Sequence, residues 1–349
     1  MRLFTPDYRN IEKVARNQAV SRIPLYEHLI SFGTMERITG RQFGHLAGGD
    51  AADRHECMRQ YCEFYRTMGY DTVTFEQCIG PAMPGSGALG GHKPGVIRDR
   101  ADYERYPWSE VPELYFKAHA GLFDALHETL PPGMKAIGGV GNGVFECVQD
   151  LVGFTDLCYL RMDDPELYAE LFVRVGDVSL SIWERFLRQY ADDFCVLRFG
   201  DDLGFKSTTL LSAADIRTHI LPQYKRIVNL VHSYEKPFLL HSCGAIFDVM
   251  EALIEEVGID AKHSNEDQIA PFTTWFERYG SRIGNFGGID TDHLCQKSKA
   301  EIGQMVRDVM DASIGHGGFA LGSGNSIPDY VPVSGYLAMV EACRAHRGE

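Results

Sequence analysis

The sequence lacks the features that mark membrane and nucleic-acid-binding proteins. None of its apolar runs reaches the roughly 18 residues that a membrane-spanning helix needs. It also has no long cluster of Lys and Arg, and its formal net charge of −14 would repel both nucleic acid and anionic membrane surfaces. Residues 1–18 contain no apolar signal region. We therefore expect a cytoplasmic protein that binds neither nucleic acid nor membranes.

Two further absences narrow the structural class. The nine cysteines are scattered and too sparse for a disulfide scaffold, so we interpret them as reduced thiols. No G-x-G-x-x-G motif follows the first predicted strand, which disfavours a doubly wound dinucleotide-binding sheet. The composition, 44% hydrophobic and 23% charged, is that of an ordinary globular protein. We expect residues 1–349 to form one large domain.

Apolar segments alternate with segments of helical periodicity along the whole chain. Ser212 is a cap signal for a helix over 213–234, Asp164 marks another helix start, and Ser298 with Glu301 predicts a capping box. Strands that alternate with helices indicate a parallel sheet, and eight such units predict an α/β fold of the closed (β/α)8 TIM-barrel type. The candidate strands cover residues 22–29, 71–76, 134–142, 193–202, 237–244, 260–267, 282–290 and 317–325.

Other segments exceed the needs of a minimal barrel. Residues 1–20 predict an N-terminal helical extension, and 41–69 add further helical material. The Gly-rich loop 79–95 follows the second strand, so it would rise over the catalytic face of a barrel. We interpret this loop as a lid, with a disordered insertion as the alternative.

Polar side chains stand at the carboxyl end of each predicted strand. In a parallel barrel these ends meet at one mouth, which is where active sites of this architecture lie. The sequence therefore predicts a single site at the mouth. Its candidate residues are Glu27, His28, Glu76, Asn142, Asp201, Asp202, His241, Cys243, His263, Glu266, Asp290 and Asn325.

The pair His241 and Cys243 is the most specific of these signals. An extended H-x-C places an imidazole and a thiol on the same side of a strand, and both groups are common zinc ligands. Glu266 ends the next strand, while Asp201 and Asp202 end the preceding one, so nitrogen, sulfur and oxygen donors would converge. The alternative is a buried Cys beside a hydrogen-bonded core His, with the two aspartates binding substrate or forming salt bridges.

The stretches "FGDDLG", "LLSAADIRTHILPQYKRIV", "FLLHSCGAI" and "IGNFGGIDTDHL" resemble the uroporphyrinogen decarboxylase superfamily of TIM barrels over roughly residues 20–345. That superfamily contains the decarboxylase and zinc-dependent methyltransferases that move a methyl group between a corrinoid protein and a thiol or a methylated substrate. The decarboxylase has an Arg-rich first segment of the form R-P-P-V-W-x-M-R-Q-A-G-R. This chain reads "RIPLYEHLISFG" there and lacks the later arginines. The acidic residues at the predicted mouth would therefore repel a polycarboxylate substrate.

The methyltransferase branch is the better match. His241 and Cys243 match its H-x-C, and Asp201 aligns with its acidic ligand position. The later Cys of that branch is absent, because Ser323, Gly324 and Asn325 stand where it would fall. Cobalamin-independent methionine synthases, similar in fold, carry a Glu about one βα unit after H-x-C, which favours Glu266 as the third ligand.

The resemblance implies a zinc ion held by His241, Cys243, Glu266 and Asp201. The chain has no D-x-H-x-x-G, so a corrinoid would arrive on a separate protein. We expect methyl transfer between a small methylated substrate or thiol and that partner, with O-demethylation as the favoured direction. The remaining role assignments are catalytic for Asp201, Asp202 and His263, and substrate-binding for Tyr26, Glu27, Glu76, Asn142 and Asn325.

Two alternatives from other classes stay open. One is a metal-free decarboxylase or lyase in which His241 and Asp201 or Asp202 act as acid and base on a small carboxylate. The other is a non-catalytic barrel that binds a ligand or a partner. The sequence leaves the oligomeric state open, with a homodimer as one option.

Overall fold

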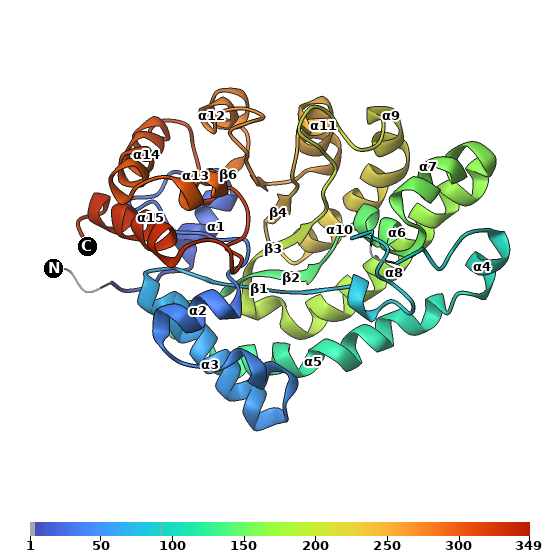
Figure 1. Ribbon diagram of the computed structural model, residues 1–349, viewed down its shortest axis with the longest axis horizontal. Helices are drawn as coiled ribbons and strands as arrows, with labels where there is room; N and C mark the ends of the chain where they lie inside the picture. Colours follow the sequence, from blue (N-terminus) through green and yellow to red (C-terminus); the bar gives the residue numbers. More distant parts are fainter. Residues whose placement is uncertain (1–3, 92) are drawn as a thin grey trace.

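The computed structural model describes residues 4–91 and 93–349, and its centre is a curled parallel sheet (Figure 1). The sheet has seven strands in the order β1-β2-β3-β4-β5-β6-β7, so each strand pairs with its neighbours along the chain. This confirms the predicted parallel α/β architecture. The strands are β1 (Val73–Cys78), β2 (Ala136–Gly141), β3 (Phe194–Gly200), β4 (Phe238–His241), β5 (Ala261–His263), β6 (Gly284–Ile289) and β7 (Phe319–Ser323).

The first predicted strand, over 22–29, does not form a ladder, so the sheet has seven strands where eight were predicted. This segment makes an isolated parallel bridge in which Leu25 pairs with Leu321 of β7. Pro24 accepts a hydrogen bond from the amide of Leu321 but has no amide hydrogen of its own to extend the ladder. On the other side, the hydroxyl of Thr74 in β1 donates to the carbonyl of Glu27. The segment thus fills the gap between β7 and β1 without closing the ladder of the barrel.

Helices follow the strands and form the outer layer. Their bounds are α1 (Arg9–Ala15), α2 (Phe32–Thr39), η1 (Gly44–Gly48), α3 (Ala51–Met68), η2 (Gly80–Ala82), α4 (Arg100–Arg105), η3 (Trp108–Glu110), α5 (Val111–Thr129), α6 (Val144–Val152), α7 (Phe154–Asp163), α8 (Pro165–Tyr190), η4 (Ala191–Asp193), α9 (Ala213–Asp215), η5 (Ile216–Ile220), α10 (Leu221–Ser233), α11 (Phe247–Ala252), η6 (Leu253–Val257), α12 (Thr273–Tyr279), α13 (Thr291–Gln296), α14 (Lys299–Ala312) and α15 (Val333–His346). None of the helices in the described ranges has the length and apolar character to cross a bilayer.

The predicted helix starts are confirmed by their caps. The side chain of Asp164 accepts from the amide of Leu167, Ser212 accepts from Asp215, and Ser298 forms a reciprocal capping box with Glu301. The helix predicted over 213–234 is interrupted by the π-helical turn η5, which lies just before Pro222. A proline inside a helix removes one amide donor and crowds the preceding turn, which accounts for the irregularity there.

The amino-terminal part of the chain closes one end of the barrel. Within the extension predicted over 1–20, the described helix is α1. Its buried Ile11 and Val14 pack in one apolar cluster with inward-facing side chains of the sheet, among them Leu239 and Phe286. The helical material predicted over 41–69 folds as η1 and α3. This packing blocks the amino-terminal end of the strands and leaves the carboxyl end as the place for a site.

The described part of the loop predicted over 79–95 is held against α6. Asp150 of α6 accepts hydrogen bonds from the amides of Gly87 and Leu89 through its carboxylate, and from Ala88 through its backbone carbonyl. These bonds hold residues 87–89 of the loop against α6. Its role as a lid stays a prediction.

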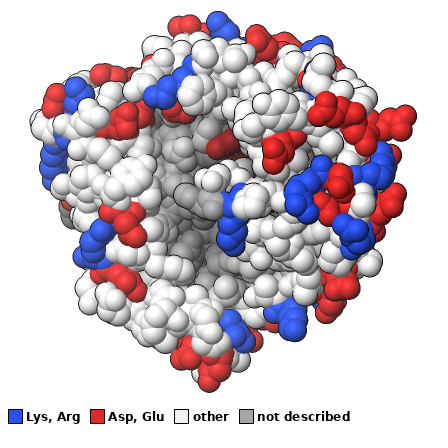
Figure 2. All heavy atoms as spheres, turned by 45° about the vertical axis from the view of Figure 1, so that its right-hand side comes forward, with Lys and Arg blue, Asp and Glu red and all other residues white. Residues whose placement is uncertain are grey.

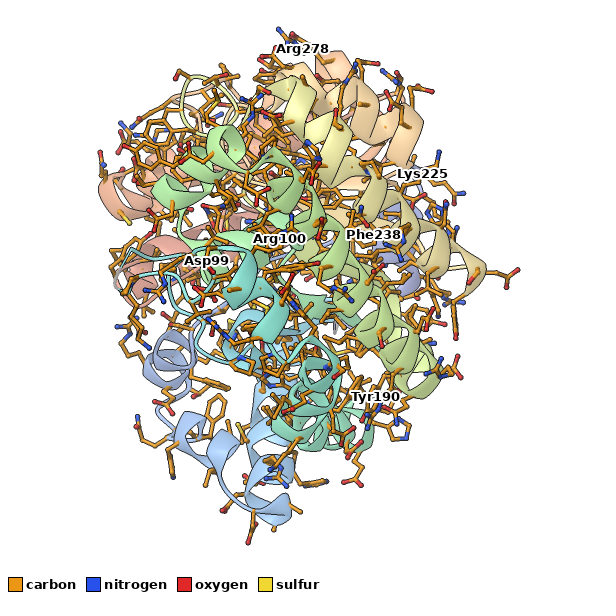
Figure 3. The ribbon with its side chains drawn as sticks, turned by 90° about the vertical axis from the view of Figure 1, so that its right-hand side faces the viewer. Asp99, Arg100, Tyr190, Lys225, Phe238 and Arg278 are labelled. Atoms are coloured by element: carbon orange, nitrogen blue, oxygen red, sulfur yellow. The ribbon has the colours of Figure 1, made fainter. Side chains whose placement is uncertain are left out.

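The long helices cover the outer face of the sheet, as the view in Figure 3 shows. Phe238 of β4 is fully buried and contacts Phe199 edge-on, with ring centroids 4.9 Å apart. Tyr190 ends α8, and Lys225 is exposed on the outer face of α10. Apolar side chains therefore fill the space between the sheet and its helices, in addition to the smaller cluster around α1.

Candidate metal centre at the barrel mouth

The site lies where β3, β4 and β5 end. His241 is the last residue of β4, and in the sheet register it pairs with Gly200 of β3 and with His263 of β5. Asp201 and Asp202 directly follow β3, and Cys243 follows β4 by two residues. Parallel strands that end at the same level bring these side chains together, as the sequence predicts.

Three donor groups of different chemistry meet here. His241, Cys243 and Asp202 each offer a ligand atom, and these atoms all lie within 4.8 Å of one another. The Nε2 atom of His241 is 3.5 Å from the Sγ atom of Cys243 and 3.9 Å from the Oδ1 atom of Asp202. Asp202 Oδ1 also accepts a hydrogen bond from the amide of Cys243, which ties the two strand ends together.

The spacing fits a tetrahedral zinc ion. Zinc bonds of about 2.0 Å to imidazole and about 2.3 Å to sulfur place the two ligand atoms about 3.5 Å apart. The distance between His241 Nε2 and Cys243 Sγ equals that value. The Asp202 side chain is 44% exposed, so it is free to make the small movement that ligation requires. A nitrogen, a sulfur and an oxygen donor also form the mixed set that leaves a zinc ion an open position.

The sulfur of Cys243 is surrounded by hydrogen-bond donors. The amide nitrogen Nδ2 of Asn325 lies 3.3 Å from Sγ, and the hydroxyl of Ser264 lies 3.6 Å from it. These donors suit a thiolate, yet burial and the nearby Asp202 carboxylate raise the pKa of the Cys243 thiol. A bound cation is what would make the thiolate form favourable at neutral pH. Without one, the thiol can donate to His241.

Hydrogen bonding fixes which nitrogen of His241 carries the proton. Burial lowers the pKa of His263 to about 3, so this imidazole is neutral. Its Nε2 atom lies 3.0 Å from the carbonyl of Ser323, which can only accept, so Nε2 carries the proton and Nδ1 is an acceptor. The Nδ1 atoms of His263 and His241 are 2.7 Å apart, so His241 donates from Nδ1. The lone pair of His241 is therefore on Nε2, which faces Cys243 and Asp202.

His28, which lies at the predicted end of the first strand, was not assigned a role from the sequence. Its ring stacks on His241 with centroids 3.7 Å apart, and its buried Nδ1 atom has no hydrogen-bond partner among the residues that the structure describes. His28, His241 and His263 form a second group of nearby donors. However, the 2.7 Å between the Nδ1 atoms of His241 and His263 is a hydrogen bond and is too short for two zinc ligands, which lie about 3.3 Å apart.

Asp201 does not join the donors, so its predicted place in the ligand set needs correction, while its predicted catalytic role stays a prediction. Its carboxylate is fully buried and accepts from the amides of Phe145 and Glu146 and from the hydroxyl of Tyr224. Burial raises the pKa of Asp201 to about 7. Both oxygens hold the amino terminus of α6. Successive residues at a strand end point in opposite directions, and it is Asp202 that faces His241.

Glu266 also stays outside the donor group, although the sequence places it as the third ligand. Strand β5 has only three residues and ends at His263. The chain then leaves the sheet, and the carbonyl of Glu266 starts a turn by accepting from the amides of Ile269 and Ala270. Among the described residues, Asp202 supplies the carboxylate that lies within 4.8 Å of both His241 and Cys243.

Three of the predicted substrate-binding residues form the floor beneath the donors. The guanidinium of Arg198, which is fully buried, donates to Glu76 at 2.6 Å and to the hydroxyl of Tyr26 at 2.7 Å. Glu27 is also fully buried; it accepts from the amide of Ser323, and its other carboxyl oxygen is in hydrogen-bond contact with the hydroxyl of Ser323. Arg198 was missed, although an arginine inside the apolar run "FCVLRFG" is a signal that it points into the barrel.

The remaining side chains form one wall of the mouth. Asn142 accepts from the amide of Gly80 and donates to Glu146, so both ends of its amide are engaged within the protein. Burial, together with the charges of Asp201 and Asp202, raises the pKa of Glu146 well above its usual range. Glu146 lies in the first turn of α6, where nothing in the sequence pattern singles it out.

These groups surround a polar chamber of about 240 Å³. A space-filling view shows a deep hollow in the molecular surface with acidic atoms recessed in it (Figure 2). The chamber is small and contains titratable groups in abundance, as expected for a catalytic site. Its lining includes His28, Glu76, Cys78, Asn142, Glu146, Asp202, His241, Cys243 and Asn325.

The solved structures that share this architecture include the following two. A methyltransferase from Methanosarcina mazei superimposes with a TM-score of 0.71 at 15% identity, over 97% of this chain and 98% of that one. A putative vitamin-B12-independent methionine synthase from Listeria monocytogenes gives a TM-score of 0.51 at 12% identity, over 94% and 97%. At these identities the likeness establishes a shared fold.

Sequence comparison identifies the family. A curated uroporphyrinogen decarboxylase from Pelobacter propionicus is 26% identical over 188 residues, which is 54% of this chain and 52% of the relative, so the match spans about half the length of that protein. The family model described as Uroporphyrinogen decarboxylase (URO-D) matches residues 86–346, well over half of the chain. The chain belongs to the uroporphyrinogen decarboxylase family.

Proposed function

We propose that this protein is a zinc-dependent methyltransferase that moves a methyl group between a small methylated substrate or thiol and a corrinoid carried by a separate protein. The observation that carries the proposal is the meeting of His241 Nε2, Cys243 Sγ and Asp202 at adjacent strand ends. The fold shared with the M. mazei methyltransferase supports it.

In this proposal the side chains of the mouth hold and orient the reacting groups. His241, Cys243 and Asp202 would bind the ion, with His263 fixing the His241 tautomer and Asn325 and Ser264 donating to the sulfur. The bound zinc would supply Lewis acidity toward a substrate oxygen or lower the pKa of a substrate thiol. A donor set with a single thiolate leaves the ion more Lewis acidic than two would, which favours the demethylating direction.

The proposal is tested by metal content and by transfer activity. Protein purified without chelator should contain about one equivalent of zinc. Incubated with a reduced corrinoid protein and a panel of methyl donors, it should convert the cobalt spectrum to the methylated form. Correctly folded protein that neither contains nor takes up zinc would reject the proposal.

A metal-free decarboxylase or lyase is the second candidate, because the curated relative is a uroporphyrinogen decarboxylase. The buried Arg198 offers no free charge to a polycarboxylate substrate, since its guanidinium is already paired with Glu76. Release of carbon dioxide from a small carboxylic acid by zinc-free protein would favour this alternative.

A further inference from the structure

A second cavity of about 350 Å³, which we call the apolar chamber, adjoins the polar chamber. It lies between the segment 29–32, the end of β1 and helices α3 and α5, where the first segment of the chain fails to form a ladder with β1. Its walls are mostly apolar, with Phe32, Met58, Tyr61, Phe75, Leu122 and Ile327 among them.

The two cavities share part of their lining. Leu29, Glu76 and Ser326 face both of them, so a molecule could occupy the two at once. Glu76 is fixed at this junction by its 2.6 Å ion pair with Arg198. A ligand crossing the junction would therefore meet a neutralised carboxylate and would not need a positive charge.

The polar groups of the second cavity are largely engaged within the protein. The hydroxyl of Tyr61 donates to the carbonyl of Thr74, and Ser31 accepts from the amide of Thr34 as the cap of α2. With Glu76 paired as well, the surface left for a ligand is mainly hydrocarbon and aromatic. Such a surface favours an uncharged apolar body over an ion, because an ion would lose its hydration without gaining a partner.

The aromatic side chains that line the second cavity also indicate the shape of the ligand that it would bind. Tyr61 meets Phe32 and Phe75 edge-to-face, with centroids 5.7 Å and 6.0 Å away. The volume is at the lower end of the range for small-molecule pockets, about 300 to 1,000 Å³. Space of this size beside aromatic rings suits one substituted ring.

We propose that this apolar chamber binds the uncharged, ring-sized body of the substrate, while the group that carries the methyl reaches through the Glu76 junction into the polar chamber. The inference rests on the proposed methyl transfer and adds the substrate class to it. Small charged donors such as methylammonium ions would leave the chamber empty and would be poor substrates.

The test uses anisole, a neutral methoxybenzene, as the probe. Ala47 lines the chamber and is half-buried on η1, so Ala47→Phe should fill the space with little effect on the core. Ala312, half-buried at the end of α14 and absent from the chamber lining, provides the matched control Ala312→Phe. Anisole binding by calorimetry should weaken about tenfold or more in the first variant, about 1.4 kcal/mol, and stay unchanged in the second.

The outcomes separate this inference from the proposed function. If anisole binds, Ala47→Phe weakens that binding, and no methyl group reaches the corrinoid, the substrate site in the apolar chamber is supported and the transfer chemistry is rejected. If small charged donors are demethylated, anisole does not bind, and Ala47→Phe has no effect, the substrate site in the apolar chamber is overturned and the transfer chemistry stands. Equal loss of binding in both variants would also overturn the chamber.

Discussion

The Nδ1 atom of His241 lies 2.7 Å from the Nδ1 atom of His263, and the other nitrogen of His263 is tied to the carbonyl of Ser323. A carbonyl cannot donate, so this chain of hydrogen bonds has one direction. It leaves the lone pair of His241 on Nε2, beside Cys243 and Asp202. His263 is in this arrangement a positioning residue, and its assignment as a catalytic group stays an untested prediction.

Replacing His263 should change zinc binding through His241. His263→Leu removes the acceptor for His241 Nδ1–H, so the tautomer is no longer fixed and zinc affinity should fall about 10- to 100-fold. His263→Gln restores a group that can accept from His241 and donate to Ser323, and it should recover most of that affinity. Competition with a chromophoric chelator measures both. Equal affinities in the two variants would show that His263 acts only by filling space.

Substitutions within the donor group should separate ligands from bystanders. His241→Ala and Cys243→Ser should each lose bound zinc and activity with the fold intact, whereas Cys295→Ser should keep both. Asp202→Asn should lower zinc affinity, because an amide is a weaker ligand than a carboxylate, and Glu266→Gln should not. Elemental analysis and circular dichroism check these outcomes. Zinc lost from Glu266→Gln and kept by Asp202→Asn would restore the ligand set expected from the sequence.

Asp201 should matter for stability more than for metal binding. Asp201→Ala leaves the amides of Phe145 and Glu146 and the hydroxyl of Tyr224 without their acceptor, so the free energy of unfolding should fall by about 2 to 4 kcal/mol. Urea unfolding in the presence of a chelator measures this without a contribution from zinc. Asp202→Ala is the matched control. Because the Asp202 side chain is 44% exposed, this substitution should lower the free energy of unfolding by less than Asp201→Ala does. A reversed order would contradict the structural role of Asp201.

Glu27 should make stability depend on pH. The hydroxyl of Ser323 contacts both Glu27 Oε2 and the carbonyl of Asn325, and its single proton satisfies both only if Glu27 is protonated and donates. Burial accordingly raises the pKa of Glu27 from 4.5 to about 8. The stability that the neutral acid provides is fully present below pH 4.5 and is lost as the pH rises toward 8.

Glu27→Gln should remove this dependence, because a neutral amide can donate to Ser323 at any pH. Relative to the unsubstituted protein, the variant should gain on the order of a few kcal/mol of unfolding free energy between about pH 5 and pH 8. Urea titrations across that interval measure the difference. A constant difference between the two proteins would mean that Glu27 keeps the same protonation state in the folded and unfolded chains.

Local patterns predicted much of the fold. Alternating strand and helix periodicity was enough to predict a parallel sheet, and the caps at Asp164, Ser212 and Ser298 stand where the sequence places them. These features depend on near neighbours along the chain. The first strand was predicted wrongly because an apolar run that contains Pro24 has the composition of a strand but lacks the donor needed to continue a ladder.

The sequence by itself determined that His241 and Cys243 would lie together, since two residues apart in an extended chain point the same way, and the structure places their ligand atoms 3.5 Å apart. Only the tertiary structure decided that Asp202 lies beside them and that Asp201 accepts hydrogen bonds from the first turn of α6. It also decided that Glu266 lies in the turn after β5, away from the donors. Which of two adjacent carboxylates faces a mouth depends on where a strand stops and what packs behind it. Both the end of the strand and the packing behind it depend on long-range contacts, which no local sequence pattern encodes.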